Sequence, residues 1–351
     1  MKIRTFAKLV RSSHFSLAMR LPKDLMAPAY RASFLAAAAG SGVLRHLARQ
    51  PLDAPALADE LGMHGEEHLL GAWLEMGVRL GELGQRGGRY RLRGRLARAL
   101  AKAEADAYVA LLEQLMRFHA PLLLDAPAML REGRRVAITD QDGALIARSS
   151  RVLEPAVQAV VEQHVDRAAP VRLLEVGCGS GTYVRHAASL NPRLTAVAID
   201  LQDEVVAQAR GNLDKWGLAD RVEVVRSDVR TYATEQKFDL VTLHNNIYYF
   251  PEGERTKVLE RARSFLMPGG RLLLTTSCQG GGPGIEMLNL WCAYADFTGT
   301  LPRPTELLDQ MRDAGFTRVR SRRLVPGEEF RAFVGTSSFD GPADGPRETA
   351  D

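Results

Sequence analysis

The stretch that decides the fold is VRLLEVGCGSGT, residues 171–182. An apolar run of strand length leads directly into three glycines, Gly177, Gly179 and Gly181. These glycines let the backbone turn tightly, approach a ligand closely and leave the next helix with an open N-terminus. Four further runs of strand length follow, LTAVAID at 194–200, RVEVVRSD at 221–228, FDLVTLHN at 238–245 and GRLLLTTS at 270–277. Helical segments separate most of them, which predicts a doubly wound, mostly parallel α/β sheet.

Acidic residues stand at the carboxyl ends of the first three of these strands, where ligands of such sheets bind. Asp200 comes nineteen residues after Gly181, and a carboxylate at that place can accept both hydroxyls of a ribose. Asp228 can accept from an adenine amino group, with the backbone amide of Val229 beside it. Glu175, just before the glycines, favours a cationic or amine-bearing ligand and would repel a pyrophosphate.

The first part of the chain has a different pattern. Three helical segments between residues 27 and 83 precede RLGELGQRGGRYRLRGRL at 79–96, in which Gly87 and Gly88 separate two short segments that can pair as a hairpin. Three helices and a two-stranded wing predict a winged-helix domain. The predicted division is a basic arm at 1–24, a winged-helix dimerisation domain at 25–100, a helical linker region at 101–168, a catalytic domain at 169–336 and a disordered tail at 337–351.

The chain has 351 residues, 46 of them Lys or Arg and 42 Asp or Glu, with a formal net charge of +4. Positive charge is concentrated at 1–24 and at 79–98, and the remainder is net acidic. Such patches are typical of proteins that bind nucleic acid, membrane surfaces or acidic substrates. A DNA-binding regulator with a cofactor-sensing domain and a methyltransferase acting on a peptide or RNA are therefore the alternatives to a small-molecule enzyme.

The three cysteines, Cys178, Cys278 and Cys292, are too few for a disulfide framework and lack the spacing of metal ligands. We therefore expect no metal, and a reducing cytoplasm as the location. No apolar run approaches the roughly 20 residues of a membrane-spanning helix. The N-terminus lacks the uninterrupted apolar core of a secretory signal.

The motifs together resemble those of class I S-adenosylmethionine-dependent methyltransferases over about residues 170–335. The resemblance is carried by EVGCGSG at 175–181, Asp200, SDV at 227–229, FDLVTLHNNIYYF at 238–250 and MPGGRLLL at 267–274. It implies a Rossmann-like fold that binds S-adenosyl-L-methionine. The residues implied to surround the cofactor are Glu175, Gly177, Gly179, Gly181, Asp200, Leu201, Asp228, Val229 and Asn245. An NAD-dependent dehydrogenase is the rival, but its usual GxGxxG would place the third glycine one residue later.

With the winged helix in front, the whole chain also resembles the bacterial and plant small-molecule O-methyltransferases. In that family the N-terminal module forms a homodimer and the helix after the fifth strand lines the acceptor pocket. The resemblance implies a homodimer, a small and partly apolar or aromatic acceptor, and no nucleic-acid partner. It also implies acceptor contacts for Tyr249, Met287, Trp291 and Tyr294, although aromatic residues at helical spacing are equally typical of an ordinary core.

The family's general base, a His after the fourth strand, is missing. Alignment of NNIYYFPEGE on that segment places Tyr248 at the His position, and His244 lies four residues upstream. Tyr248 and His244 are the candidate catalytic residues. Packing over the cofactor is the alternative for Tyr248, and a structural hydrogen bond is the alternative for His244. Because an unperturbed Tyr has a pKa near ~10 and is a poor base at neutral pH, we expect O-methylation of an acidic group or C-methylation of an enolisable carbon.

Overall fold

The computed structural model describes residues 15–137, 140 and 142–338. The chain divides into two compact units. Unit 1 is Met1–Arg131 with Asp142–Val152, and unit 2 is Glu132–Gln141 with Leu153–Asp351. Residues 101–168, predicted as one linker region, are thus shared between the units. Residues 1–14 of the predicted arm and 339–351 of the predicted tail lie outside the described residues.

Unit 1 contains the predicted helices and hairpin. Its first half is built from α3 (Ala27–Gly40), α4 (Val43–Arg49), α5 (Ala54–Leu61), α6 (Glu67–Arg79), β1 (Leu83–Arg86) and β2 (Arg89–Leu92). β1 and β2 pair antiparallel, and Gly87 and Gly88 between them have φ of 57° and 76°. Positive φ at both central residues is what a two-residue hairpin turn requires. The predicted hairpin is therefore confirmed, and the glycine pair explains it.

A buried carboxylate joins the hairpin to the helices of unit 1. Glu82 is fully buried; its carboxylate accepts hydrogen bonds from Arg31 Nε at 2.5 Å and from the Ala97 amide at 3.0 Å. A Cβ on Gly94 would overlap this carboxylate. Leu44, Leu57 and other apolar side chains form the core around it. Since a buried charge needs partners of this kind, the Glu82 contacts fix where the hairpin meets the helices.

The rest of unit 1 is helical. α2 (Phe15–Arg20) and the π-helix η1 (Leu21–Met26) precede α3. They are followed, after β2, by α7 (Arg95–Leu100), η2 (Ala103–Ala105), α8 (Asp106–Gln114), η3 (Leu115–His119), α9 (Ala120–Glu132) and α10 (Gly143–Ser150). α3 and α10 both pack against α8, and Arg148 bonds Asp106 through two nitrogens at 2.7 and 3.2 Å. The described part of the basic arm is therefore helical.

Unit 2 is built on a seven-stranded sheet with the order β5-β4-β3-β6-β7-β9-β8. The strands are β3 (Val171–Val176), β4 (Leu194–Asp200), β5 (Val222–Arg226), β6 (Phe238–His244), β7 (Leu266–Ser277), β8 (Phe316–Arg323) and β9 (Phe330–Ser337). β3 to β7 pair in parallel, and only β8 and β9 add antiparallel pairs. The predicted mostly parallel α/β sheet is confirmed. Strand order reverses between β3 and β6, which opens a crevice at their carboxyl ends.

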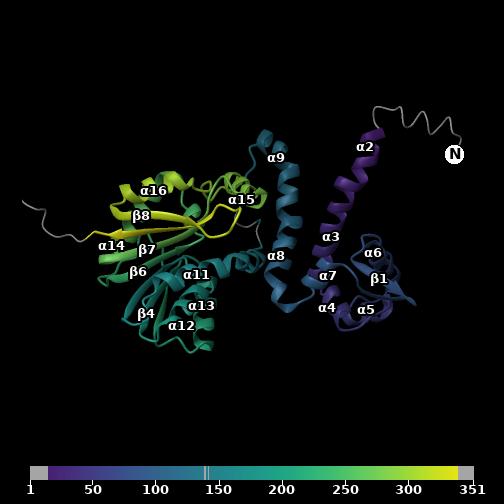
Figure 1. Cartoon of the computed structure of the whole chain (residues 1–351), viewed down its shortest axis with the longest axis horizontal. Coiled ribbons are helices and arrows are strands. Elements are labelled where there is room, and N and C mark those ends of the chain that lie inside the picture. Colours follow the sequence, from purple (N-terminus) through teal and green to yellow (C-terminus); the bar gives the residue numbers. More distant parts are fainter. Residues whose placement is uncertain (1–14, 138–139, 141, 339–351) are drawn as a thin grey trace, which may run out of the picture. The chain divides into compact units, whose positions relative to one another are not determined.

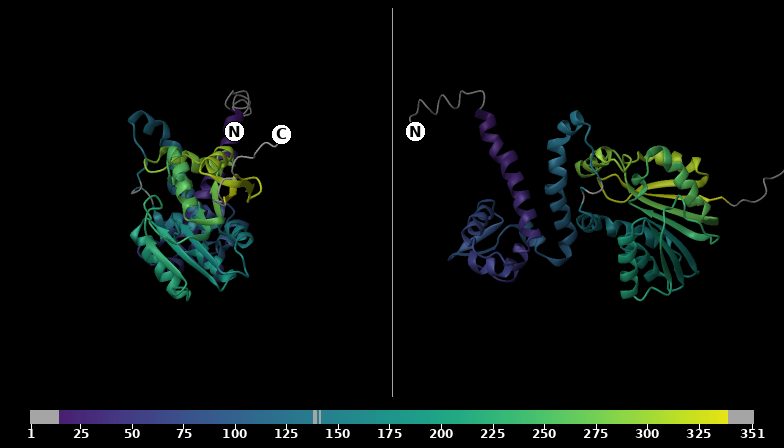
Figure 2. Two further views of the ribbon diagram at one scale, coloured as in Figure 1. Left: turned by 90° about the vertical axis from the view of Figure 1, so that its left-hand side faces the viewer. Right: turned by 180° about the vertical axis from the view of Figure 1, so that it is seen from behind.

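Helices cover both faces of this sheet (Figures 1 and 2). α11 (Glu154–His164), α12 (Thr182–Leu190) and α13 (Asp203–Lys215) pack on one face, and α14 (Glu252–Ser264) and α16 (Pro304–Asp313) on the other. The short η6 (Ile247–Tyr249) follows β6, and α15 (Pro283–Tyr294) follows β7. No helix in the described ranges has the length and apolarity to cross a membrane.

Candidate functional site

Glu175 is the most unusual side chain of the predicted cofactor site. It lies on β3 with 1% of its surface exposed. Among the described residues, no donor lies at the distance and angle of a hydrogen bond to either carboxylate oxygen. Burial raises the pKa of Glu175 to about 8; Asp200 adds to the rise, and the backbone amide of Val184 opposes it. A buried acid without a partner is costly unless a ligand supplies one.

The glycine turn after β3 has the conformation that its sequence predicts. Gly177, Gly179 and Gly181 have φ of 67°, 53° and 79°, a region that other residues rarely adopt. A Cβ on Gly177 would overlap the side-chain nitrogen of Asn246, which donates to the Val176 carbonyl at 2.5 Å. Nothing lies within 4 Å of the corresponding position on Gly179. The turn therefore leaves open space beside Gly179 and none beside Gly177.

Asp200 ends β4 next to this turn. Its carboxylate accepts from the Gly179 amide at 3.1 Å and from the Gln202 amide at 3.3 Å. Leu201 directly after it is exposed. Both oxygens keep acceptor capacity, since a carboxylate oxygen has more than one lone pair. Asp200, the carboxylate predicted to bind the ribose, thus lies beside the glycine turn, and the apolar side chain of Leu201 follows it.

Asp228 is occupied by a neighbouring side chain. Arg230 donates to both of its carboxylate oxygens at 2.7–3.1 Å and reaches Glu254 at 3.0 Å. These hydrogen bonds hold the pKa of Asp228 below its ordinary value. The side chain of Val229 is buried, and its amide donates to no other described residue. The backbone amide of Val229 is therefore available as a donor at the place where the sequence predicts that adenine binds.

Unpartnered polar atoms gather at the carboxyl end of β6. Within the described chain, Thr242 Oγ1, His244 Nε2, Asn245 Oδ1 and Asn246 Oδ1 are buried without a hydrogen bond. Thr242 pairs in register with Glu175 on β3, so these atoms and the Glu175 carboxylate belong to two adjacent strand ends. Asn245 has φ of 55°, a strained conformation that is typical of functional sites. Such a cluster marks a place where a polar ligand binds.

His244 is held in a structural position. Its Nδ1 lies 2.9 Å from Thr275 Oγ1, and its ring packs edge-on against Tyr183 at 4.8 Å between centroids. Burial lowers the pKa of His244 to about 3. The ring is therefore neutral at physiological pH and a weak base.

The two tyrosines predicted near the acceptor lie together on η6. Their ring centroids are 4.9 Å apart. Tyr248 is buried, and burial, followed by the neighbouring Tyr249, raises its pKa well above the ordinary value. Tyr249 is 41% exposed. Tyr248 is thus a neutral hydrogen-bonding group, while Tyr249 presents a ring to the surface.

The three residues predicted on the helix after β7 all lie on α15. Met287 and Tyr294 are buried, and Trp291 is partly buried with its ring 5.7 Å from Phe297. One small apolar cluster consists of Tyr248, Cys292 and Leu301, with Trp291 packed against it. The structure therefore brings Trp291 and Tyr248 together. Met287 and Tyr294 lie outside this cluster.

Several residues of the site were not predicted. Thr242 carries the signal of a hydroxyl within the apolar run LVTL at 240–243, and Tyr183 is an aromatic residue in the first turn after the glycines. Burial raises the pKa of Tyr183. Thr275 and Asn246 act through hydrogen bonds to His244 and Val176, contacts that only the folded chain creates.

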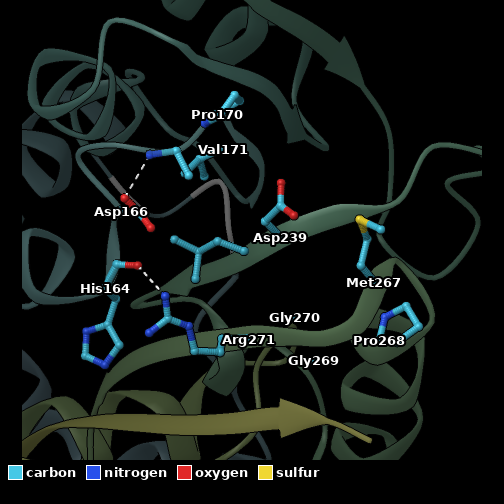
Figure 3. Close-up of a pocket in the computed structure, with 12 residues that line it drawn as sticks. His164, Asp166, Pro170, Val171, Asp239, Met267, Pro268, Gly269, Gly270 and Arg271 are labelled. Carbon is cyan, nitrogen blue, oxygen red and sulfur yellow. Dashed lines mark hydrogen bonds between the residues drawn. The ribbon is translucent and has the colours of Figure 1, made fainter. Parts of the chain in front are cut away.

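A cavity of about 370 Å³ lies at the opposite edge of the sheet (Figure 3). Val171 and Asp239 line it at the amino ends of β3 and β6, and Arg271 lines it from within β7. Arg271 donates to the His164 carbonyl at 2.9 Å, and Asp166 accepts from the Ala168 and Ala169 amides. The polar groups of this cavity are thus engaged with one another, unlike those at the carboxyl ends. The candidate site is the carboxyl edge.

Comparisons with known proteins show which proteins this chain is similar to. Residues 173–270, which span β3 to the start of β7, match the family described as a methyltransferase domain. A demethylspheroidene O-methyltransferase of Rhodobacter capsulatus is 24% identical over 194 residues, which cover 54% of this chain and about half, 48%, of that protein. A 3-hydroxy-5-methyl-1-naphthoate 3-O-methyltransferase of Streptomyces sahachiroi is 25% identical over 320 residues, 87% of this chain and 91% of that protein.

Solved structures share the fold along nearly the whole chain. The mitomycin 7-O-methyltransferase MmcR superposes with a TM-score of 0.75 at 19% identity, covering 92% of this chain and 98% of that one. PigF, solved with S-adenosylhomocysteine (SAH), gives 0.73 at 19% identity over 93% and 99%. The shared fold therefore extends beyond unit 2.

Proposed function

We propose that this chain, a methyltransferase that uses S-adenosylmethionine, methylates an oxygen or an enolisable carbon of a small, partly aromatic acceptor. The supporting observation is the pair of adjacent strand ends where Glu175 and the polar atoms of β6 are buried without partners. These groups would accept a cationic, polar ligand at the edge of the sheet where such folds bind one.

The residues present suit this cofactor. When bound, it supplies an electrophilic methyl group on a sulfonium sulfur. Glu175 would take its ammonium group, Asp200 the ribose hydroxyls, and Asp228 with the amide of Val229 the adenine. The glycine turn would give the backbone its close approach. Because Arg230 holds both Asp228 oxygens, the adenine would share that carboxylate with Arg230.

The protonation of the two candidate catalytic residues limits the acceptor. His244 has a pKa lowered to about 3 and one ring nitrogen beside Thr275. Tyr248 has a pKa raised well above its ordinary value, so its hydroxyl stays protonated and can only orient an acceptor. Neither side chain is suited to removing a phenolic proton at neutral pH. The acceptor must therefore bring a nucleophile that is already ionised or easily enolised.

The relatives favour oxygen over carbon. Both curated relatives described above are O-methyltransferases, and one methylates the 3-oxygen of a 3-hydroxynaphthoate, which is its hydroxyl. An acceptor of that class also carries a carboxylate that is already ionised at neutral pH, and its apolar ring suits the aromatic side chains of Tyr248 and Trp291. We infer that an acceptor of this kind is held in place for in-line attack, and that positioning supplies much of the rate.

A panel of acceptors tests the proposal. We expect methyl transfer from labelled S-adenosylmethionine to 3-hydroxy-2-naphthoate or to a cyclic 1,3-diketone. The kcat/KM for these acceptors should exceed that for an unactivated naphthol by at least about 10-fold. The reason is that an acceptor whose pKa lies above the assay pH is ionised only in small part. The pH profile should follow the acceptor's own ionisation. Preference for the unactivated naphthol, with an enzyme pKa between 6 and 8 in the profile, would contradict the proposal.

Replacement of Tyr248 by Phe is expected to lower kcat/KM about 10-fold through the acceptor's KM, because one hydrogen bond to the acceptor is lost. The pH profile should keep its shape, since the hydroxyl transfers no proton. The measurement is steady-state kinetics beside the Tyr108→Phe variant, whose side chain is exposed on α8 of unit 1. Unchanged kinetics would show that Tyr248 only packs.

We further propose that unit 1 forms a homodimer in the cytoplasm through two exposed helical segments, of which only the start of α3 and the residues just before it lie within the predicted dimerisation domain at 25–100, and that residues 169–336 are the catalytic domain. Two helical segments of unit 1 leave large apolar side chains exposed. The exposed side chains are those of Leu17, Met19, Leu21, Leu25, Met26 and Tyr30 on α2 to α3, and of Leu123, Leu124 and Leu130 on α9. Exposed apolar surface of this extent marks an interface, and a second copy is the commonest partner. The three cysteines are free and buried, which suits a reducing compartment.

A double variant tests the dimer. Leu25→Lys with Leu124→Lys places two charges on side chains that are 63% and 80% exposed, so we expect a dimer-to-monomer shift in light scattering. Leu69→Lys on α6, 57% exposed, is the matched control and should stay dimeric. A monomeric wild-type chain would refute the interface.

A further inference from the structure

Arg255 on α14 is the largest side chain in the described chain that is almost fully buried, with 1% of its surface exposed. It forms no ion pair with a described carboxylate. Its guanidinium donates instead to two backbone carbonyls, from Nε to Phe250 at 3.1 Å and from Nη2 to Thr300. Burying a guanidinium in this way is costly, and burial lowers the pKa of Arg255. The cost needs a function to explain it.

The two carbonyls belong to segments that are far apart in sequence. Phe250 follows η6 and its two tyrosines, whereas Thr300 lies beyond α15. The Gly299 amide donates to the Tyr248 carbonyl at 2.8 Å. A Cβ on Gly299 would lie 2.8 Å from the Phe250 carbonyl oxygen and 2.9 Å from Arg255 Nη2. Arg255 thus completes a close contact between residues 247–250 and 298–302.

The second segment is tied to α15 and to the end of β7 as well. Asn289 on α15 accepts from the Leu301 amide at 3.1 Å, and Gln279 after β7 donates to the Leu301 carbonyl at 2.6 Å. Leu301 is fully buried beside Tyr248 and Cys292. We call this cluster of Tyr248, Cys292 and Leu301 the acceptor-side wall. Its members come from η6, α15 and the segment 298–302. Backbone carbonyls of the first two accept hydrogen bonds from the third, Tyr248 from the Gly299 amide and Cys292 from Thr298 Oγ1.

We propose that Arg255 is a positioning residue that fixes the acceptor-side wall by holding the Phe250 and Thr300 carbonyls together. This inference rests on the proposed function, because it assigns the wall to the acceptor. Arg255 Nε and Nη2 both donate to backbone carbonyls. Arg255 would therefore act through the backbone that carries Tyr248 and Leu301, and not by touching cofactor or acceptor.

Three variants test this in the full chain. Arg255→Ala leaves a space lined by the two carbonyls, Arg255→Met fills that space without donors, and Arg255→Lys restores charge with a single donor group. Arg261→Ala is the matched control, because Arg261 also lies on α14 and donates to a backbone carbonyl, that of Tyr232. All four should bind SAH within about twofold of wild type, which shows that the cofactor side is intact.

Hydrogen exchange gives a readout that needs no acceptor. We expect amides in 247–250 and 298–302 to exchange at least about 10-fold faster in Arg255→Ala and Arg255→Met, with β3 and β4 unchanged. Arg261→Ala should leave both segments as in wild type. Equal protection of both segments in all variants would overturn the proposal, whatever the acceptor is.

Kinetics with 3-hydroxy-2-naphthoate gives the second readout. Arg255→Ala and Arg255→Met should lose about 100-fold in kcat/KM, the scale of a misplaced acceptor, and Arg255→Lys less. Guanidinium chloride at non-denaturing concentration should restore activity to Arg255→Ala and not to Arg255→Met. Rescue of neither, together with faster exchange throughout unit 2, would mean a purely structural role. If wild type methylates no probe, the proposed function fails and the exchange result alone decides the role of Arg255.

Discussion

Glu175→Gln is expected to weaken SAH binding by about 100-fold, because a buried charged hydrogen-bond acceptor for the ammonium group is replaced by a neutral amide. The same substitution should stabilise the free protein at pH 8. Burial raises the pKa of Glu175 from 4.5 to about 8, so the folded chain keeps a proton that the unfolded chain releases. The contribution of Glu175 to stability is therefore fully present below pH about 4.5 and is lost as pH rises towards 8.

Calorimetric titration and thermal melts measure the two effects. At pH 8 we expect Glu175→Gln to melt about 5 °C above wild type, with the difference vanishing near pH 4.5. Glu223→Gln, the same substitution at an exposed site on β5, should leave both affinity and melting unchanged. A Glu175→Gln protein that binds SAH as tightly as wild type would remove Glu175 from the cofactor site.

Gly177→Ala is expected to destabilise the chain by about 2–3 kcal/mol and to abolish detectable cofactor binding. A non-glycine residue at φ of 67° costs about 1–2 kcal/mol. The new methyl group would also displace the Asn246 nitrogen from the Val176 carbonyl, which costs about 1 kcal/mol more. Urea unfolding and SAH titration measure the two losses.

Gly179→Ala is the matched control for this prediction. Its φ of 53° is also positive, but nothing lies within 4 Å of the added methyl group. We expect it to lose only about 1 kcal/mol of stability, while its methyl group occupies the open side of the turn and weakens cofactor binding. Equal destabilisation by both substitutions would show that the contact with Asn246 carries no weight.

The sequence predicted what depends on local pattern. Alternation of apolar runs and helices predicted the parallel part of the sheet, and the glycine spacing predicted the turn at Gly177 and its neighbours. The Gly87–Gly88 pair predicted the hairpin. The antiparallel strands β8 and β9 were not predicted. In β8 the apolar residues Phe316 and Val319 are interrupted by Arg318, Arg320 and Arg322, a composition typical of a charged edge strand.

For the site, the sequence predicted which residues lie at the carboxyl ends of the strands, but not the contacts of their side chains. The structure places Glu175 and Asp200 beside the glycine turn, and this much follows from the sequence because adjacent parallel strands end at one edge. That Glu175 lacks a partner, that Arg230 occupies Asp228, and that His244 is buried against Tyr183 depend on side-chain packing between distant segments. The role proposed for Arg255 depends on residues 45 positions apart in sequence, which no local pattern connects.

Proton release on SAH binding shows whether the buried Glu175 carboxylate receives the cofactor's ammonium group. Calorimetric titration of SAH at pH 7, in two buffers of different ionisation enthalpy, counts the protons exchanged. With a pKa of about 8 in the free protein, Glu175 is mostly protonated at pH 7 and must ionise to pair with the ammonium. We expect the release of close to one proton per bound SAH. Identical heats in the two buffers would contradict it.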